Sequence, residues 1–498
     1  MYQFLKNPQI ENIYDLFAYC CMFLLEAADK RNFAPSENGS EKYNDIANAV
    51  DTYIVNREIE GKRNSLLMLL EQLHMICGFE CTPEQAFDIA RTIDDYIDLE
   101  EPVPDSTNSN AYFVRYSALN IHFTSDIRIL PVLDNTFMTR SQANFSNDGY
   151  PMLRNTKASN SSMLGSYFKN YIIMEKGTIE EFPVNVSRVR GDSGLGKYYE
   201  GKNNIKLTLI PFTQVDLDEI QNIRYEGRYF SCEGMKSGQE ERLLSKQKRL
   251  FELLAQENAT DFIIFPEMLF TENMTQCSIG RNERPEMVVN GSVWEDGYNY
   301  STICLCGNEV YKHYKRCPYI AKRHEGGESG KEREYQEKLN PLGKSNKTYN
   351  IIEAGSFGRI AIGICKDIDD PSMLLLWRML RVNLLLVPAF SSSADLESTA
   401  ESLASLYNII VVLCNACSAV GGLKEEQQAA LPSKAIGFIA LPARKGKKRT
   451  SVLEYYYKKD TCSSCVDVCM GHKAIIKFDG KRIVPGTDIK TFDFEWIG

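Results

Sequence analysis

Between about residue 203 and residue 415, short apolar runs alternate with segments that have helical periodicity. Residues 205–212 and 261–265 are apolar runs of strand length, and they flank the charged helical segment Gln239–Gln256. The same order then repeats, with strand patterns at 359–364, 384–387 and 409–413 and helical patterns at 372–382 and 402–407. Alternation of this kind predicts an α/β domain built on a central sheet.

The remaining sequence indicates two further regions, since 498 residues suffice for two or three domains. Residues 1–105 are predicted to form a helical domain, because apolar residues recur at three- and four-residue spacing and Thr82-Pro83-Glu84-Gln85 has the pattern of a helix start. Residues 106–202 are rich in Asn, Ser and Gly and contain short strand-like runs. They are predicted to be a connecting region or a small irregular β-containing subdomain, followed by the α/β domain at 203–498.

Composition narrows the class of protein. The formal net charge is −9, which argues against nucleic acid or an anionic membrane as the main partner. The apolar run at 17–25 is too short to span a bilayer, and acidic residues precede it, so we expect neither a membrane anchor nor a signal peptide. Several of the 15 cysteines lie inside apolar runs, which is typical of buried thiols in a reducing cytoplasm.

Three predicted strand ends carry reactive side chains. Glu267 follows the run at 262–265 and Pro266, and Cys365 follows the small-residue run at 358–364. Between them in sequence, strand alternation at 310–318 puts Tyr311, His313 and Lys315 on one face. Each feature alone has a plain structural explanation, as a core thiol, a turn or a solvated lysine. The order Glu, Lys, Cys at the strand ends of one α/β domain is much rarer, and it favours nucleophilic catalysis by the thiol.

These segments resemble the nitrilase superfamily, the carbon–nitrogen hydrolases. The matching pieces are FPE at 265–267, the lysine strand, GRIAIGICKD at 358–367, VPAFSSS at 387–393, LYNIIVVLCN at 406–415 and SKAIGFIALP at 433–442. Tyr335-Gln336-Glu337, with Pro341 and Gly343 after it, resembles the segment that supplies a second glutamate. The resemblance implies a four-layer αββα sandwich and a thiol-dependent hydrolase of an amide or nitrile.

The resemblance also implies roles for individual residues. Cys365 would attack the carbon, Glu267 would act as general base, and Lys315 would stabilise the tetrahedral centre together with the backbone N–H of Lys366. Glu337 would orient substrate or water. The charged insertion at 322–337 keeps Lys312 and Lys322 open as the lysine, and Glu325 open as the second glutamate. Lys366 and Asp369 depart from the residues common in the family, so the substrate is not carried over.

A second cluster of reactive residues lies near the C-terminus. Cys462, Cys465, Cys469 and His472 have the spacing C-x2-C-x3-C-x2-H, which is compact enough for a structural zinc site. The run also resembles part of an iron–sulfur loop, but a fourth cysteine at the required spacing is missing. The alternative is a thiol-rich turn without metal. No cofactor is expected for catalysis itself.

The sequence leaves a second class of function open. A nitrilase-like domain of this kind is expected to form a homo-oligomer, and the N-terminal region could bind a protein partner while catalysis is secondary or absent. Nitrilase-like domains with extra N-terminal regions also resemble those attached to bacterial defence proteins, so an effector in antiviral defence is an open alternative. The expected small-molecule partner is an amide or nitrile, and no membrane partner is expected.

Overall fold

The structure is a computed structural model of the whole chain, and it divides into two compact units. The first comprises Met1–Ser109, Arg115–Glu181 and Met379–Arg381, and the second comprises Asn110–Val114, Phe182–Arg378 and Val382–Gly498. The residues that the structure describes are 10, 12–28, 41–57, 59–78, 81–96, 113–117, 119–120, 127–131, 168, 171–175, 184–189, 193–199, 202–212, 215, 217–256, 260–279, 286–324, 332–340, 348–354, 357–407, 409–421, 435–442, 451–456, 472–478, 489–491 and 495–496. The predicted domain boundaries at 105 and 202 remain predictions, and the longest continuous part of the second unit to start near them is Phe182–Arg378.

The described part of the first unit contains four helices over the predicted helical region. They are α1 (Ile13–Ala28), α2 (Glu41–Asn56), α3 (Lys62–Cys77) and α4 (Pro83–Tyr96). Helix α1 packs against α4, and α2 packs against both α3 and α4. Phe17 of α1 and Phe87 of α4 meet the ring of Phe168 at centroid distances of 4.9 and 5.9 Å, and all three are fully buried. A shared apolar core therefore holds these helices together.

The predicted helix start at Thr82 is confirmed. The backbone N–H of Thr82 donates to Oε1 of Gln85 at 2.9 Å, and the backbone N–H of Gln85 donates to Oγ1 of Thr82 at 3.3 Å. This reciprocal pair satisfies backbone N–H groups that the first turn of α4 leaves without helical partners. The unit also has a small antiparallel sheet of β2 (Leu119–Asn120), β3 (Ile127–Pro131) and β4 (Tyr171–Glu175).

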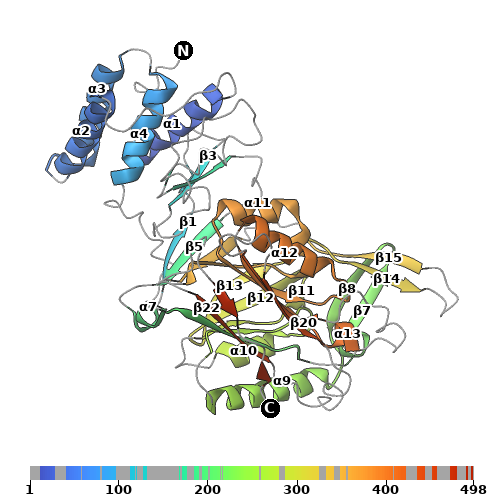
Figure 1. The fold of residues 1–498 in the computed structure, drawn as a ribbon. Coiled ribbons are helices and arrows are strands. Elements are labelled where there is room, and N and C mark those ends of the chain that lie inside the picture. Colours follow the sequence, from blue (N-terminus) through green and yellow to red (C-terminus); the bar gives the residue numbers. More distant parts are fainter. Residues whose placement is uncertain are drawn as a thin grey trace. The chain divides into compact units, whose positions relative to one another are not determined.

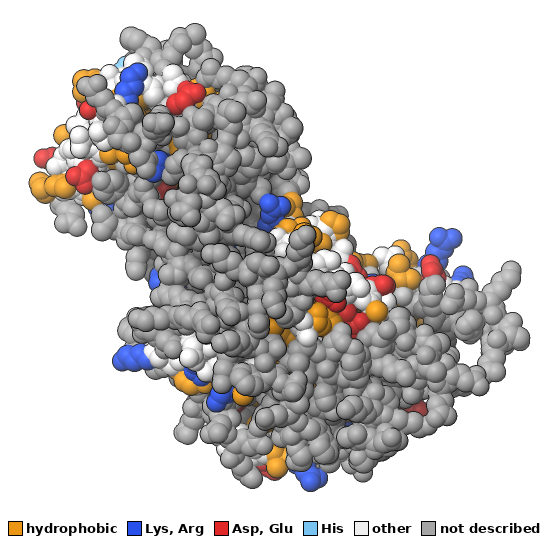
Figure 2. Space-filling view, in the orientation of Figure 1, with side chains coloured by type: hydrophobic (Ala, Val, Ile, Leu, Met, Phe, Trp, Pro, Cys, Tyr) orange, Lys and Arg blue, Asp and Glu red, His pale blue; other side chains and the backbone are white. Residues whose placement is uncertain are grey.

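Exposed apolar side chains gather on two helices of the first unit. Val55 of α2, Ile59 just beyond it, and Leu67, Met68 and Met75 of α3 are between 42% and 76% exposed. Figure 2 shows hydrophobic side chains, in orange, at the edge of this unit. No described helix of the chain is both long and apolar enough to cross a membrane.

Two large sheets dominate the described part of the second unit. The first has the order β1-β5-β16-β17-β18-β19-β20-β21. Its strands are β1 (Phe113–Ser117), β5 (Val184–Val189), β16 (Tyr349–Glu353), β17 (Arg359–Ile362), β18 (Leu384–Ala389), β19 (Ile410–Asn415), β20 (Ala435–Leu441) and β21 (Ser451–Tyr456). Strands β17, β18 and β19 run parallel, and they are connected through α11 (Pro371–Met379) and α12 (Asp395–Tyr407).

The second large sheet has the order β11-β12-β10-β9-β6-β22-β23, with β13 paired to β12 and β24 paired to β22. Its strands are β6 (Asn204–Leu209), β9 (Phe262–Ile264), β10 (Met287–Val289), β11 (Val293–Glu295), β12 (Tyr298–Leu305), β13 (Asn308–Tyr314), β22 (His472–Phe478), β23 (Ile489–Thr491) and β24 (Glu495–Trp496). Strands β6, β9 and β10 run parallel. The predicted strand–helix alternation therefore feeds two separate sheets.

The two large sheets pack face to face. Leu207 and Phe262 of one sheet share a buried cluster with Ile360 and Leu386 of the other. Helices α9 (Gln239–Gln256) and α10 (Glu272–Ile279) pack on the outer face of the sheet that contains β9, and α11 and α12 lie on the opposite side of the unit (Figure 1). The unit is a four-layer αββα sandwich, as the sequence predicts.

A smaller sheet lies beside the sandwich, with the order β14-β15-β8-β7. Its strands are β7 (Gln221–Glu226), β8 (Tyr229–Met235), β14 (Ile320–His324) and β15 (Glu332–Glu337). The charged insertion at 322–337 thus contributes strand structure, because β14 and β15 pair antiparallel. Along β15, Tyr335 and Glu337 are buried while Glu334 and Gln336 are exposed, which is the alternation of a half-buried strand.

Candidate active site

Four predicted site residues meet at strand ends from three different sheets. Glu267 lies three residues past β9, Lys315 follows β13 directly, Glu337 is the last residue of β15, and Cys365 lies three residues past β17. Each of them is at most 2% exposed. Such burial of ionisable groups is rare unless they are paired, and here they pair with one another.

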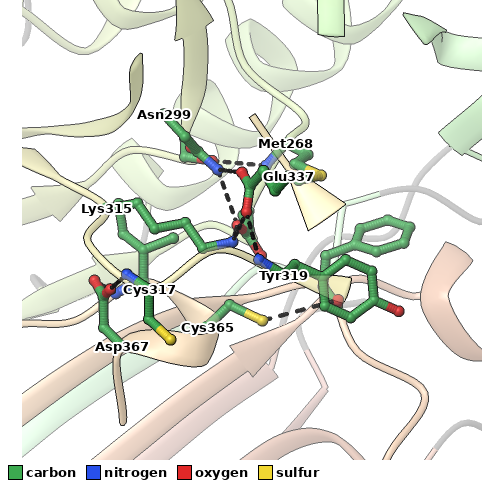
Figure 3. Close-up of polar contacts among 12 residues, drawn as sticks. Met268, Asn299, Lys315, Cys317, Tyr319, Glu337, Cys365 and Asp367 are labelled. Atoms are coloured by element: carbon green, nitrogen blue, oxygen red, sulfur yellow. Dashed lines mark hydrogen bonds and ion pairs between the residues drawn. The ribbon is translucent and has the colours of Figure 1, made fainter. Parts of the chain in front are cut away.

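One ammonium group is shared by two carboxylates. Nζ of Lys315 lies 2.5 Å from Oε1 of Glu267 and 2.6 Å from Oε2 of Glu337. Nδ2 of Asn299 donates to both carboxylates as well, at 3.0 Å to Glu267 and 2.8 Å to Glu337. Figure 3 shows the lysine and asparagine side chains converging on Glu337, with the Cys365 sulfur beside them. The cluster has one positive and two negative groups, so it favours retention of the ammonium.

Backbone hydrogen bonds hold the main chain at the residues that carry these side chains. The N–H of Lys315 donates to the carbonyl of Asn299 at 2.7 Å, which ties the end of β13 to β12. The N–H of Glu337 donates to the carbonyl of Tyr319 at 2.7 Å, and the N–H of Tyr319 donates back to Oε2 of Glu337 at 2.9 Å. The N–H of Glu267 donates to the carbonyl of Ala389 at 3.3 Å, across to the other sheet.

Of the alternatives to Lys315 and Glu337, the structure describes the side chain of Lys312 alone, and that side chain lies away from the cluster. Nζ of Lys312 lies 3.6 Å from Oε2 of Glu272 and 4.6 Å above the ring of Tyr300, on the opposite face of β13. Lys322 has only its backbone described, within β14, and Glu325 lies outside the described residues. Among the described side chains, Lys315 is the lysine that reaches Glu267.

Cys365 has an unusual backbone conformation. Its φ is +48°, and Met268, directly after Glu267, has a φ of +63°. Left-handed conformations of non-glycine residues cost free energy and concentrate at functional sites. Cys365 is the first residue of the short 3₁₀ helix η4 (Cys365–Asp369). Its Sγ atom lies 3.9 Å from the carbonyl oxygen of Phe390. The turn presents the thiol to the Glu–Lys cluster.

Burial and charge set the protonation of the cluster. Burial raises the pKa of the Glu267 carboxyl; the Lys315 charge opposes this rise, and the Glu337 charge adds to it. Burial also raises the pKa of the Cys365 thiol, and the negative charge of Glu267 raises it further. The pKa of Lys315 is raised well above its usual value, because the two carboxylates outweigh the effect of burial. The resting site therefore holds a protonated thiol and an ammonium group.

Lys366 and Asp369, the departures noted in the sequence, bind each other. Nζ of Lys366 lies 2.8 Å from Oδ2 of Asp369, and Oγ1 of Thr399 donates to Oδ1 of Asp369 at 2.7 Å. Both charged side chains are 26% exposed, so this pair lies toward solvent while Cys365 is buried. The ammonium of Lys366 is thus already paired in this structure.

Two residues of the site were not predicted from the sequence. Asn299 occurs in the run Gly-Tyr-Asn, which reads as a turn, and its contacts to Glu267 and Glu337 are 32 and 38 residues away in sequence. Gly291 is the other: a Cβ there would collide with the carbonyl oxygen of Pro266 and the ring of Phe270. A glycine at this position lets the backbone approach the segment that carries Glu267.

The predicted metal cluster lies almost entirely outside the described residues. Cys462, Cys465 and Cys469 are not described, and His472 is described only for its backbone in β22. Among the side chains that are described, no group of three or more His, Cys, Asp or Glu could hold a metal ion. The zinc site remains a prediction.

No protein-family model matches the sequence, and a search of the curated proteins gives no match. Nitrilase-superfamily proteins are among the solved structures that resemble the chain. Nit3 from Saccharomyces cerevisiae, of branch 10 of that superfamily, is 15% identical, with 53% of this chain and 93% of Nit3 covered and a TM-score of 0.31. An amidase from Nesterenkonia sp. AN1, with acrylamide added at its active-site cysteine, is 12% identical, with coverages of 52% and 94% and a TM-score of 0.31. Glutamine-dependent NAD+ synthetase from Acinetobacter baumannii is 16% identical, with coverages of 52% and 46% and a TM-score of 0.30. At these low values, the chemistry below rests on side-chain geometry alone.

Proposed function

We propose that the second unit is a nitrilase-type hydrolase of a small non-peptide C–N bond, with Cys365 as nucleophile. The observation that carries the proposal is the Lys315 ammonium held between the carboxylates of Glu267 and Glu337, beside a thiol in a left-handed turn. A thiol needs a nearby base to become a nucleophile, and a developing oxyanion needs fixed positive charge. The cluster supplies both.

The first half-reaction forms a thioester. Glu267 takes the thiol proton while Sγ of Cys365 attacks the carbon of an amide. Lys315 and the backbone N–H of Lys366 stabilise the negative charge that develops on the substrate oxygen. Collapse of the tetrahedral centre breaks the C–N bond, and the proton on Glu267 passes to the leaving amine. With a nitrile, the same attack gives a thioimidate, and the proton on Glu267 passes to the nitrile nitrogen. Water then attacks the thioimidate carbon and ammonia leaves, which gives the same thioester.

The second half-reaction releases the acid. Glu267, again ionised, removes a proton from water as the water oxygen attacks the thioester carbon, and the thiolate leaves and takes up that proton. Glu337 keeps Lys315 and Asn299 in place during both steps. Because all four central side chains are at most 2% exposed, this site favours a small acyl group over a peptide.

The test is intact-protein mass spectrometry after incubation with a panel of small amides and nitriles. We expect an acyl adduct on Cys365 that disappears when the substrate is consumed, together with release of ammonia or amine. Cys365→Ala should abolish both signals. Cys317→Ala is the matched control, because Cys317 is a partly exposed thiol two residues after Lys315 that has no role in the scheme. Turnover of the same substrate by Cys365→Ala would rule the mechanism out.

The second candidate function is an interaction module. The exposed apolar side chains of α2 and α3 favour a binding role for the first unit, whether or not the second unit is active. Self-association and a partner from a defence system remain proposals of the same kind. Electron microscopy and sizing of wild type beside Cys365→Ala and Met75→Glu would separate assembly from catalysis. Loss of assembly in Met75→Glu alone would support the module.

A further inference from the structure

Asp367 is a buried carboxylate that the proposed mechanism does not use. It lies two residues after Cys365 in η4 and is fully buried. Its Oδ2 accepts a hydrogen bond from the backbone N–H of Ile364 at 2.9 Å, directly before the nucleophile. Its Oδ1 accepts from the backbone N–H groups of Arg316 and Cys317, both at 2.8 Å, directly after Lys315. One carboxylate thus binds the segments of both the thiol and the ammonium.

These two segments belong to different layers of the sandwich. The turn of Cys365 follows β17 in the eight-stranded sheet, whereas Lys315 follows β13, which pairs with β12 of the other large sheet. Figure 3 shows Asp367 beside Cys317, with Lys315 above Cys317 and the Cys365 side chain to its right. The spacing between nucleophile and cation therefore depends on how the ends of two sheets are held together.

His313 completes the environment of Asp367. Its Nε2 lies 3.3 Å from Oδ2 of Asp367, and its ring meets the ring of Tyr349 edge to face at 5.4 Å. Burial lowers the pKa of His313, although the hydrogen bond and charge of Asp367 oppose this, so the imidazole is neutral. Because an ionised carboxylate only accepts hydrogen bonds, we assign the ring proton to Nε2. The hydrogen bonds from His313 and the backbone amides lower the pKa of Asp367 despite its burial. The carboxylate is ionised and has four hydrogen-bond donors.

We propose that Asp367 is a positioning residue that sets the separation between the Cys365 thiol and the Lys315 ammonium, with His313 holding the carboxylate in place. The inference rests on the proposed function, since it assigns a role to that separation. Its physical basis is that a shift of about 1 Å in a reacting group can lower a rate by about 100-fold. Asp367 touches neither the substrate nor the reacting atoms.

The test uses Asp367→Asn in the full chain. An asparagine oxygen can still accept from Arg316 and Cys317, but its NH₂ group then faces the N–H of Ile364, so the bond to the nucleophile turn is lost. The probe is iodoacetamide, and the readout is the alkylation rate per reactive Cys365, followed at several pH values by mass spectrometry of the peptide that contains Cys365, because other thiols such as Cys317 are partly exposed. Counting per reactive thiol removes any effect of misfolded protein. We expect a decrease of about 100-fold.

The sign of the change separates positioning from electrostatics. Removing a negative charge near a thiol makes the thiolate easier to form, so electrostatics alone predicts faster alkylation in Asp367→Asn. Positioning predicts slower alkylation, because Lys315 no longer meets the sulfur correctly. Asp370→Asn is the matched control, since the same change three residues later leaves an oxygen that can accept from the N–H of Ser372. It should keep the wild-type rate.

Two further outcomes keep the test decisive. If Asp367→Asn does not fold, His313→Phe replaces it: this change removes one donor from Asp367, and we expect the alkylation rate of Cys365 to decrease by about tenfold. Alkylation of folded variants within twofold of wild type, or faster, would overturn the inference. Because the alkylation assay needs no substrate, failure of wild type to hydrolyse any amide would count against the proposed function and leave this comparison intact.

Discussion

Replacement of Glu337 by glutamine tests whether the negative charge of Glu337 makes Glu267 a stronger base. The Nζ of Lys315 is 2.5 Å from Oε1 of Glu267 and 2.6 Å from Oε2 of Glu337, so these oxygens are at most about 5 Å apart. Two unit charges at that separation interact by about 3 kcal/mol at an effective dielectric constant of about 20. The negative charge of Glu337 therefore makes Glu267 a stronger base, and Lys315 is shared between them.

Glu337→Gln removes that repulsion, so that Lys315 forms an ion pair with Glu267 alone. The pKa of Glu267 falls, because the Glu337 charge is one of the causes that raise it. A weaker base accepts the thiol proton less readily, and about 3 kcal/mol corresponds to a rate decrease of up to about 100-fold. The acid limb of the pH–rate profile should also move to lower pH, since Glu267 stays ionised further into the acid range.

The assay follows alkylation of Cys365 by iodoacetamide across pH, with amide hydrolysis measured in parallel. Glu334→Gln is the matched control, because Glu334 lies on the same strand with its side chain exposed. Equal melting temperatures would show that the fold survives in both variants. If Glu337→Gln has the same alkylation rate as Glu334→Gln and the same acid limb in its pH–rate profile, then Glu337 does not raise the pKa of Glu267. That result would refute the charge argument.

The remaining predictions concern strain, packing and pH. Cys365→Gly should be about 1 kcal/mol more stable to urea than Cys365→Ala, because glycine accepts a φ of +48° without strain and both variants lack the thiol; equal stabilities would remove the strain argument. Gly291→Ala should cost about 1–3 kcal/mol and reduce activity, because its Cβ pushes on the carbonyl of Pro266 and so displaces Glu267; full activity would contradict this. Since the folded-state pKa of Asp367 is lowered, its stabilisation is present above its unfolded value of about 3.9 and lost as pH falls through the folded value. Wild type should therefore have a higher urea midpoint than Asp367→Asn at neutral pH, and the difference between their midpoints should shrink at acid pH. A difference that stays the same at both pH values would contradict this prediction.

The choice of lysine was accessible from the sequence through strand alternation. Lys315 shares a face with Tyr311 and His313, and all three are buried, whereas Lys312 lies on the other face near Tyr300. The period of two is a local property of a strand, so residue spacing alone can report it. The charged insertion obscured this argument only because its own strand structure was not recognised.

Glu337 is a harder case, because its position depends on pairing between distant strands. Strand β15 pairs parallel with β8, so Glu337 lies beside Phe230, more than 100 residues earlier in sequence. Alternation along 334–337 predicts that Glu337 is buried, but not what it meets. The resemblance to a known segment supplied the role, and the contact to Lys315 came from the structure.

Asn299 and Asp367 lay beyond sequence reasoning for the same physical reason. An asparagine near a turn and an aspartate after a cysteine both have ordinary local explanations in turn chemistry. Their hydrogen bonds reach groups 32 to 51 residues away in sequence, across sheets that the pattern of apolar residues does not align. Which sheet ends meet depends on the packing of the two large sheets, a property of the whole unit.

The net charge of the buried cluster explains why these groups occur together. With Lys315 positive and Glu267 and Glu337 negative, the cluster of buried side chains holds one net negative charge. Transfer of the thiol proton to Glu267 moves that charge onto the Cys365 sulfur without changing the total. The step therefore adds no new buried charge, and Lys315 remains beside the negative group throughout. The Glu337 charge makes that total negative and raises the basicity of Glu267, which is why its neutralisation should disturb catalysis more than it disturbs the fold.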